Sequence, residues 1–485
     1  MKELVLSSEN LLAVSPAIVL TLTGFLVVIL RLVNVRISRA VLLFITVAGM
    51  AVAALFSLRL WGDGIVGFGG MVSSDPFALT FNFIFLLGAV LSVLLSSNDY
   101  EESYLLYAEY FAIVLFATVG MVLMAASTNL VVLFLGLETL SISLYVLAGI
   151  KRNEERSLEA AFKYFLLGAF ASAFLLYGIA FIYGSTGTLD LRNVATFVTH
   201  SSVAEAPLLM LGALLVIVGL GFKIAMFPFH MWAPDVYQGA PTPITAFMST
   251  GSKAAGFAAM LRVLFSATDG TAADWTAVFW VLAVLTMTVG NISALLQKNV
   301  KRMLAYSSIA HAGYILVGLV AWNSMGAASM VFYLLAYTFM NVGAFGVISY
   351  LAGKESEFQE LDDLRGLAFQ RPTAAIVMAI FMFSLAGLPP TAGFVGKFYI
   401  FSAAVKAGHV PLVIIGVVNS MISAYYYLGL VVTMFMRQPA RDWGPQKRLP
   451  SVALSLAVAV VGTFALGLFP SALMDQIQAF ISSMI

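Results

Sequence analysis

The chain is a succession of long apolar runs separated by short polar segments. Fourteen runs are close to twenty residues long, the length that an α-helix needs to cross the hydrocarbon core of a bilayer. They cover residues 11–30, 40–60, 76–96, 105–126, 129–149, 158–183, 207–232, 243–265, 275–296, 302–322, 326–351, 373–404, 411–436 and 450–474. The pattern predicts an all-α polytopic membrane protein with about fourteen transmembrane helices.

The composition of the chain supports this prediction. Of the 485 residues, 61% are hydrophobic and 10% are charged, whereas charged residues make up about 25% of ordinary soluble domains. The first apolar run is long enough to span a bilayer and has no Ala-x-Ala cleavage pattern. We therefore expect it to be retained rather than removed as a signal peptide.

Two of the predicted spans contain helix-breaking residues. Pro228 lies in the seventh span, within the stretch 219–243. Pro389 and Pro390 lie in the twelfth span, within the stretch 385–397. Proline removes an amide donor and clashes with the preceding turn, and membrane interiors tolerate the freed carbonyl groups only beside protein or a water-filled cavity. We therefore expect spans seven and twelve to be broken helices.

The two breaks lie five spans apart, and an odd offset reverses the orientation of a helix in the membrane. This pattern predicts two inverted five-helix repeats, spans four to eight and nine to thirteen, with the broken helices at equivalent positions. The expected organisation is an N-terminal three-helix segment (1–100), a first repeat (101–266), a second repeat (267–437) and a C-terminal helix (438–485).

Basic residues are concentrated in the loops on one side of the predicted bundle. Sixteen of the 25 Lys and Arg residues lie in loops that follow odd-numbered spans. The opposite side holds five, which are Lys2, Arg59, Arg192, Arg262 and Lys406. Because cytoplasmic loops carry the excess of Lys and Arg, the basic side is predicted to be cytoplasmic and both termini to lie outside. The polar outer segment 185–206 is expected to form a short hairpin or an extended segment.

Seven charged residues remain inside the predicted spans. They are Lys163, Lys223, Lys253, Lys397, Glu109, Glu138 and Glu159. A charged side chain at the bilayer centre costs about 2.5–3.5 kcal/mol on insertion scales, and such residues usually pair, face a hydrated cavity or mark an ion pathway. Their number favours a common function in ion transport.

Three of the lysines are the strongest candidates for proton carriers. Lys223 precedes the break in span seven, and Glu138 in the middle of span five is its expected partner. A nearby carboxylate favours the charged lysine whereas burial disfavours it, so a movement of Glu138 is expected to switch Lys223 between holding and releasing a proton. Lys253 lies about 15 Å into span eight at 1.5 Å per residue, and is the expected relay between two half-channels. Lys397, beside the second break, is the expected carrier of the second half-channel.

Four further residues are secondary candidates. Glu159 and Lys163 are spaced i and i+4 with the glutamate first, which stabilises a helix without any transport function, so both interpretations stay open. Glu109 falls in the first turns of its span, where it lies among lipid headgroups or contacts a neighbouring protein. His311 in span ten can act as a proton relay because its unperturbed pKa is about 6.5, but a lone histidine is more often a hydrogen-bonded core residue, so both interpretations stay open.

The sequence offers no site for a redox cofactor or a metal. Cysteine is absent, so iron–sulfur ligation and thiolate-held zinc are excluded, and no glycine-rich loop follows a strand to bind a nucleotide. The four histidines have no metal-like spacing. His230 and Asp235, beside the first break, are expected to organise that loop rather than to carry protons. The net charge of +1 gives no indication of nucleic-acid binding.

Four motifs make the chain similar to a known family. They are LFLGLETLS at 133–141, FKIAMFPFHMWAPDVYQGAPTP at 222–243, KRMLAYSSIAHAGY at 301–314 and LAGLPPTAGFVGKF at 385–398. With them the chain resembles, over nearly its whole length, the antiporter-like membrane subunits of respiratory complex I, the proton-pumping NADH:quinone oxidoreductase. Within that family, VYQGAPTP at 236–243 and Lys397 are most similar to the subunit N type.

The resemblance implies roles for particular residues. In that family a glutamate on helix five and a lysine on helix seven form the first half-channel, helix eight supplies a central lysine and helix twelve supplies the distal charge. By motif these are Glu138, Lys223, Lys253 and Lys397, and the carboxylate of helix four is Glu109.

The resemblance also implies where the rest of the chemistry takes place. FMN, iron–sulfur clusters and the quinone site are expected in other subunits, with no cofactor or metal in this chain. The expected partners are the other complex I membrane subunits that flank it in the membrane arm, together with lipids, and no nucleic acid. The expected location is the bacterial inner membrane, or the equivalent coupling membrane of an organelle, with both termini periplasmic.

Two alternatives to the complex I interpretation stay open. A subunit of a related cation/proton antiporter, of a membrane-bound hydrogenase or of a ferredoxin-driven relative would use the same helices. A non-conducting scaffold would neutralise all its charges in static pairs.

Overall fold

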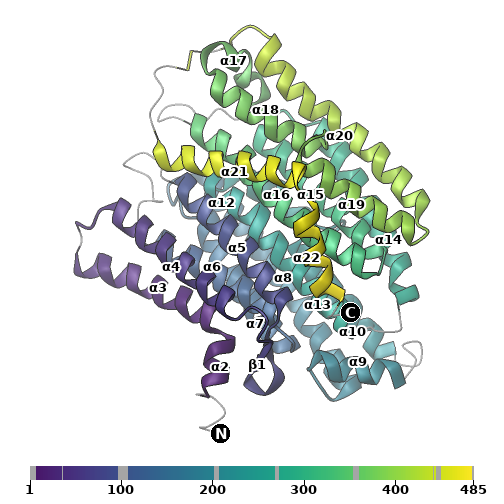
Figure 1. The fold of residues 1–485 in the computed structure, drawn as a ribbon. Coiled ribbons are helices and arrows are strands. Elements are labelled where there is room, and N and C mark those ends of the chain that lie inside the picture. Colours follow the sequence, from purple (N-terminus) through teal and green to yellow (C-terminus); the bar gives the residue numbers. More distant parts are fainter. Residues whose placement is uncertain are drawn as a thin grey trace.

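The computed structural model describes residues 7–34, 36–96, 108–200, 207–267, 272–352, 360–440, 442–443 and 449–482. Eleven helices among these residues are long and apolar enough to cross a membrane. They are α3 (Ser15–Val33), α4 (Arg39–Arg59), α5 (Pro76–Leu95), α6 (Ala108–Ala126), α7 (Leu130–Ala148), α8 (Glu155–Thr186), α14 (Ala272–Leu295), α15 (Val300–Val320), α16 (Ser324–Leu351), α20 (Val410–Met436) and α21 (Pro450–Leu468) (Figure 1). The prediction of an all-α polytopic membrane protein is confirmed.

The seventh, eighth and twelfth predicted spans are built from shorter helices. The seventh consists of α10 (Pro207–Lys223) and α11 (Trp232–Gly239), and the twelfth of α18 (Pro372–Ala386) and α19 (Ala392–Lys406). The eighth is continuous but irregular, since α12 (Thr242–Phe247) passes through a π-helical turn (Met248–Ser252) into α13 (Lys253–Ala267). A helix thus occupies each of the fourteen predicted runs, while the number of membrane crossings stays a prediction.

Both predicted helix breaks are confirmed. After Lys223 the chain leaves the helical path until Trp232, and Pro228 lies within this interval. The indole Nε1 of Trp232 donates to the carbonyl oxygen of Phe222 at 2.9 Å, which satisfies one of the carbonyl groups that the end of α10 leaves free.

The second break is closed by a glycine. Gly387 caps α18 with a φ of 88°, and its N–H donates to the carbonyl oxygens of Phe383 and Ser384. Glycine adopts this left-handed conformation without the steric cost that a Cβ atom imposes. Pro389 and Pro390 then follow, and the next helix begins at Ala392.

The remaining elements are short. They are α2 (Ser8–Ala13), α9 (Leu191–His200), α17 (Leu367–Gln370), α22 (Ser471–Ser482), two 3₁₀ turns (Phe68–Gly70 and Leu361–Leu364) and two strands, β1 (Ile65–Gly67) and β2 (Val72–Ser74). The strands pair antiparallel, with Val66 opposite Ser73. They form a hairpin between α4 and α5 at the end of the molecule where the N-terminus lies (Figure 1).

Two predictions about these segments were wrong. Residues 185–206 contain helix α9 rather than a hairpin or extended segment, because Leu191, Val194 and Val198 recur at helical spacing and are buried together; residues 201–206 lie outside the described part. The last apolar run does not continue to residue 474, since α21 ends at Leu468 and α22 starts separately at Ser471.

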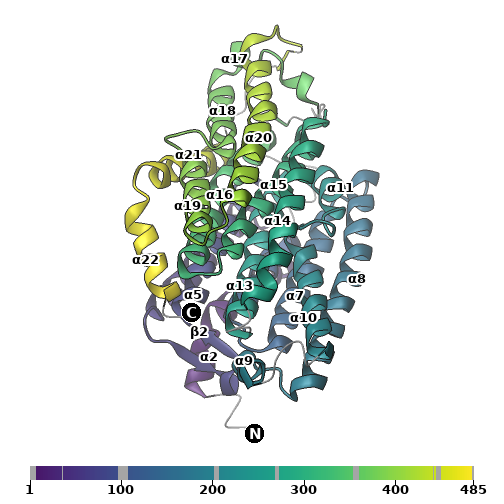
Figure 2. The same ribbon diagram turned by 90° about the vertical axis from the view of Figure 1, so that its right-hand side faces the viewer.

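Among the long apolar helices of the described residues, α15 and α16 are the most deeply buried. Both lie in the middle of the bundle in two perpendicular views (Figures 1 and 2), whereas α3, α4 and α20 lie at its edges in Figure 1. Nearly all residues of α15 and α16 are buried, polar ones included. Any polar side chain on these two helices must therefore find its hydrogen-bond partners inside the protein.

Close helix packing recurs at the positions that the predicted repeats would relate. A Cβ atom at Gly120 of α6 would lie 2.5 Å from the backbone nitrogen of Leu140 on α7. One at Gly290 of α14 would lie 2.6 Å from the backbone nitrogen of Ala310 on α15. Helices α6 and α7 are the fourth and fifth spans, and α14 and α15 are the ninth and tenth. Both predicted repeats would therefore begin with two helices whose close contact requires a glycine.

Candidate functional site

Lys223 lies at the end of α10, directly before the first break, and is 3% exposed. Its Nζ donates to the hydroxyl oxygen of Ser141 on α7 at 2.9 Å. The ring of Tyr164 on α8 lies 5.7 Å from the same nitrogen. The buried lysine is therefore held by a neutral hydroxyl and an aromatic face.

Glu138, the expected partner of Lys223, interacts with it without a direct ion pair. Its half-buried carboxylate accepts a hydrogen bond from Ser172 of α8 and acts on Lys223 electrostatically. Ser141, which accepts the hydrogen bond from Lys223, follows Glu138 by about one turn of α7. Ser141, Ser172 and Lys223 line a cavity of about 10 Å³, close to the smallest volume, roughly 10–15 Å³, that holds one water molecule.

Lys253 is the first residue of α13, directly after the π-helical turn, and is 1% exposed. Its Nζ donates to both the hydroxyl and the carbonyl oxygen of Ser308 on α15. The ring of Tyr337 on α16 lies 5.3 Å from the ammonium. Lys253 therefore also has neutral partners, which both of the central helices supply.

Lys223 and Lys253 lie on helices that pack against each other. A Cβ atom at Gly256, about one turn after Lys253 on α13, would lie 3.4 Å from Cβ of Lys223. Glycine at this position lets the end of α10 approach α13 closely.

Lys397 lies on α19 beyond the second break and is 5% exposed. Its Nζ donates to the carbonyl oxygens of Leu385 and Ala386, both at 3.1 Å, and to Ser420 Oγ of α20 at 2.9 Å. Leu385 and Ala386 are the last residues of α18, whose carbonyls have no intrahelical partner and attract a positive charge. The broken helix therefore supplies the partners of its own lysine.

Helix α15 connects Lys253 to Lys397. Ser308, His311 and Tyr314 follow one another at intervals of three residues and share one face of that helix. Ser308 binds Lys253, and the ring of Tyr314 lies 4.7 Å from the Nζ of Lys397. His311 lies between them and is 1% exposed.

Two tyrosines hold the His311 ring. Nδ1 lies 2.6 Å from the hydroxyl of Tyr333, and Nε2 lies 3.0 Å from the hydroxyl of Tyr427. Tyr427 also shares a hydrogen bond with Ser307. Each hydroxyl can donate or accept, so these contacts allow either ring nitrogen to carry the proton.

Glu159 and Lys163 belong to a separate, partly exposed cluster. Lys163 Nζ lies 2.7 Å from Glu159 Oε1 and 2.7 Å from Asp235 Oδ2, while Arg302 lies 2.5 Å from Asp235 Oδ1. Burial acts to raise the pKa of Asp235, but hydrogen bonds from Lys163 and Arg302 hold it below its ordinary value. Asp235 therefore ties α11 to α8 and α15, as expected of a residue that organises the break; His230 lies beside Phe227, with stacked rings 5.5 Å apart.

Two other charged residues do not contact Lys223, Lys253 or Lys397. Glu109 is exposed in the first turn of α6, which leaves open its predicted contact with another protein. Arg262 was expected on the outer side, and its side of the membrane stays a prediction. It is 3% exposed within α13 and forms an ion pair with Asp75.

The serines and tyrosines that contact the lysines were missed by the sequence analysis. The available signal was the three-residue spacing of Ser308, His311 and Tyr314 along α15. Ser141, Ser420, Tyr164, Tyr333, Tyr337 and Tyr427 have no comparable signal, because isolated hydroxyl residues in membrane helices commonly act only as contacts between helices.

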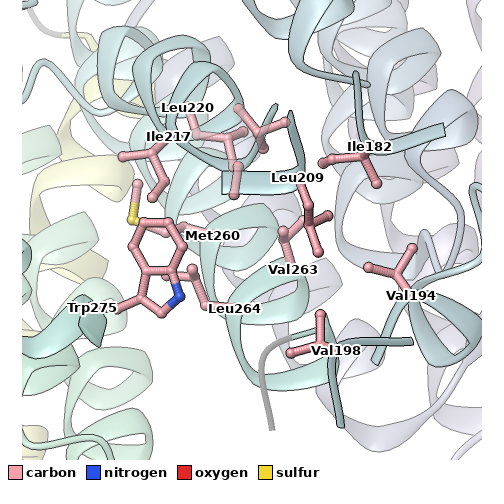
Figure 3. Close-up of a pocket in the computed structure, with 12 residues that line it drawn as sticks. Ile182, Val194, Val198, Leu209, Ile217, Leu220, Met260, Val263, Leu264 and Trp275 are labelled. Carbon is pink, nitrogen blue, oxygen red and sulfur yellow. The ribbon is translucent and has the colours of Figure 1, made fainter. Parts of the chain in front are cut away.

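An apolar pocket lies between α8, α9, α10, α13 and α14, and none of Lys223, Lys253 and Lys397 lines it. Figure 3 shows its aliphatic walls with Trp275 at one side, and its lining includes Ile217, Met260 and Leu264. No ionisable side chain lines it. Within the described ranges, no three His, Cys, Asp or Glu residues are placed to hold a metal ion.

Comparison with known proteins identifies the family. The family described as "NADH:quinone oxidoreductase/Mrp antiporter, TM" matches residues 127–423, which is more than half of the chain. The chain belongs to this family. The matched segment includes Glu138, Lys223, Lys253, His311 and Lys397, and the resemblance inferred from the four motifs is confirmed.

Individual relatives of the NADH:quinone oxidoreductase/Mrp antiporter family extend the match to nearly the full length. NADH-quinone oxidoreductase subunit N from Trichlorobacter lovleyi is 48% identical, over 97% of this chain and 96% of that protein. A subunit N from Roseiflexus castenholzii is 46% identical, over 90% of this chain and 89% of that protein.

Two solved structures share the fold. A chain of respiratory complex I from Thermus thermophilus superposes with a TM-score of 0.81 at 38% identity, covering 95% of this chain and 98% of that one. A chain of the Mrp complex from Dietzia gives a TM-score of 0.85 at 22% identity, covering 99% of this chain and 98% of that one. At that identity the second comparison shows the fold alone.

Proposed function

We propose that this chain is the proton-translocating subunit N of an NADH–quinone oxidoreductase, and that Lys223, Lys253 and Lys397 carry the protons. The observation that supports this most strongly is the chemistry of their partners. In the described part of the chain, none of the three buried lysines forms an ion pair. Their contacts are hydroxyls, backbone carbonyls and aromatic rings.

Neutral partners allow a lysine to change its protonation state. A static ion pair would leave an unpaired buried carboxylate whenever the lysine lost its proton, which is costly. A serine hydroxyl accepts a hydrogen bond from an ammonium and donates one to a neutral amine. Ser141, Ser308 and Ser420 can therefore hydrogen-bond to Lys223, Lys253 and Lys397, respectively, whether the lysine is charged or neutral. This argues against a scaffold whose charges are permanently neutralised.

The order of the groups defines a route. Glu138 tunes Lys223, whose helix packs against α13 and so adjoins Lys253. Ser308, His311 and Tyr314 then lead along α15 to Lys397. Each proton moved outward must work against about 2.3 kcal/mol per 100 mV of membrane potential, so changes in proton affinity along this route must be driven by energy supplied elsewhere.

In this proposal the energy comes from remote quinone reduction. FMN, the iron–sulfur clusters and the quinone site belong to other subunits, and the neighbouring membrane subunits complete the proton path. The chain would lie in a bacterial inner membrane with both termini periplasmic. The two inverted repeats, 101–266 and 267–437, would each provide one broken helix, with Lys223 beside the first break and Lys397 beside the second.

The test is ion movement in vesicles that contain the assembled complex. Proton uptake that requires both NADH and quinone is expected. Ion exchange driven by an imposed gradient without either substrate would instead indicate an antiporter subunit. Replacing NADH by a reduced ferredoxin would identify a ferredoxin-driven relative.

A further inference from the structure

The most deeply buried ion pair among the described residues joins Arg262 to Asp75 and involves none of the three buried lysines. Arg262 NH1 lies 2.5 Å from Asp75 Oδ2, and NH2 lies 2.8 Å from Asp75 Oδ1. The guanidinium of Arg262 also donates to the carbonyl oxygen of Ala125, from NH2 at 2.9 Å and from Nε at 3.3 Å, and lies 4.6 Å from the centre of the Phe77 ring. Two parallel hydrogen bonds between Arg and a carboxylate give a geometry that Lys cannot reproduce.

These contacts join the ends of two helices to the interior of a third. Asp75 is the N-cap of α5, where its Oδ1 also accepts from the backbone N–H of Ala78 at 2.9 Å. Ala125 lies in the last turn of α6, whose carbonyl groups lack intrahelical partners. Arg262 itself lies in α13, which packs against both helices. The pair therefore fixes α13 to the N-terminal helix segment and to the first helix of the predicted first repeat.

Asp75 stays ionised in this environment. Burial acts to raise its pKa, but the charge and the hydrogen bonds of Arg262 hold it below its ordinary value. The attachment is thus a charged pair rather than a neutral contact.

Arg262 lies on the same helix as Lys253. They are nine positions apart, which corresponds to about 14 Å along the axis at 1.5 Å per residue. Between them, Ala255, Phe257, Ala258 and Leu261 are fully buried and apolar, so this part of α13 is a rigid, tightly packed connection. On its other side Lys253 adjoins the π-helical turn, whose hydrogen bonding departs from the regular helix and which is a type of turn often found at functional sites.

We propose that Arg262 is a positioning residue for Lys253. By clamping the far half of α13 to α5 and α6, it holds the Lys253 ammonium at Ser308 and confines backbone movement to the π-helical turn. This inference rests on the proposed proton-carrying function of Lys253.

The test compares variants in the assembled complex reconstituted in vesicles. Arg262→Lys keeps the charge and loses the two-pronged contact, while Asp75→Asn keeps a side-chain oxygen to cap α5 and removes the ion pair. Both are expected to lower proton uptake per NADH oxidised by at least about threefold, since displacements of about 1 Å strongly impair reactions that depend on position. Arg59→Lys, an exposed arginine at the end of α4, is the matched control and should pump normally.

The ratio of protons to NADH separates positioning from mere structural support. A purely structural residue would reduce the amount of assembled complex but leave this ratio unchanged in what assembles, and that result for both variants would overturn the inference. Lys253→Met is measured in parallel. If it pumped normally, the proposed function of Lys253 would fail; if it lost pumping while both clamp variants kept the normal ratio, only the positioning role would fail.

Discussion

At the scale of residues, the buried cations fall into two chemical classes. Lys223, Lys253 and Lys397 contact neutral oxygens and aromatic rings, whereas Arg262 contacts a carboxylate. Arginine keeps its proton under all physiological conditions, while lysine loses it readily when buried. In the proposed function, lysine therefore lies where a proton must move and arginine where a helix must be held.

The sequence identified the lysines but not their surroundings. Single charges inside apolar runs are so costly that they indicate function without any structure. Serine and tyrosine carry no such cost, so Ser141 and Tyr427 could not be distinguished from ordinary contacts between helices. Which side chain lies beside which lysine depends on helix rotation and packing, and neither can be read from hydrophobic runs.

Removing Glu138 tests its proposed tuning role. Glu138→Ala should slow proton-coupled NADH oxidation without loss of the assembled complex, because Lys223 keeps its bond to Ser141 and loses only the electrostatic influence of the carboxylate. NADH oxidation and proton uptake are measured together in vesicles. A variant that pumped at the normal rate would require another partner for Lys223.

Tyr427→Phe tests the hydrogen-bond network around His311. The change leaves His311 Nε2 and Ser307 without the tyrosine hydroxyl, and each unpaired buried polar group costs about 1–3 kcal/mol. The thermal unfolding midpoint should fall and proton uptake per NADH should decrease. Tyr425→Phe is the matched control on the same helix, since Tyr425 is 76% exposed; equal effects of the two changes would refute a specific role for the network.

At the scale of elements, the broken helices were predictable and the irregular ones were not. Proline within an apolar run marks a break because its ring and missing N–H are incompatible with a continuous helix. The π-helical turn before Lys253 has no equivalent residue signal. Helix α9 was mistaken for a hairpin because polar residues hid the helical spacing of Leu191, Val194 and Val198.

Gly387→Ala tests the connection between the second break and its lysine. A left-handed conformation costs a residue with a Cβ atom about 1–2 kcal/mol, and the new methyl group would lie 3.1 Å from Lys397 Cδ. Stability and proton uptake per NADH should both fall. Gly187→Ala is the control, because Gly187 also caps a helix with a positive φ, but a methyl group added there would have no neighbouring atom within 4 Å. The control should lose stability but pump normally. Equal pumping in the two variants would contradict the prediction, because it would show that the conformation at Gly387 does not affect Lys397.

At the scale of the whole molecule, the predicted architecture of an all-α membrane bundle with two broken helices is confirmed, and the family assignment agrees with it. The inverted relation of the two halves and the orientation of the termini stay predictions. Hydrophobic runs determine how many segments can cross a membrane, but broken and irregular helices blur that count. Charge bias indicates a direction only for the chain as a whole.

The exposed surface of the bundle leads to a prediction about assembly. Glu109 is exposed and Glu138 is half-buried in the isolated chain, and carboxylates rarely face lipid. We expect purification in mild detergent to yield the chain together with several other hydrophobic subunits. Recovery of a stable, active monomer would contradict the proposed role as one part of a larger pump.

The central claim is that buried lysines release and accept protons, and Lys223→Arg tests it most directly. The substitution keeps the positive charge, but an arginine with a pKa above about 12 cannot readily give up its proton. The measurement is proton uptake per NADH oxidised in vesicles that contain the assembled complex, with Lys406→Arg at an exposed position as the control. The account predicts normal assembly and loss of most pumping for Lys223→Arg and no change for the control. Full retention of pumping by Lys223→Arg would show that Lys223 is a fixed charge and not a carrier.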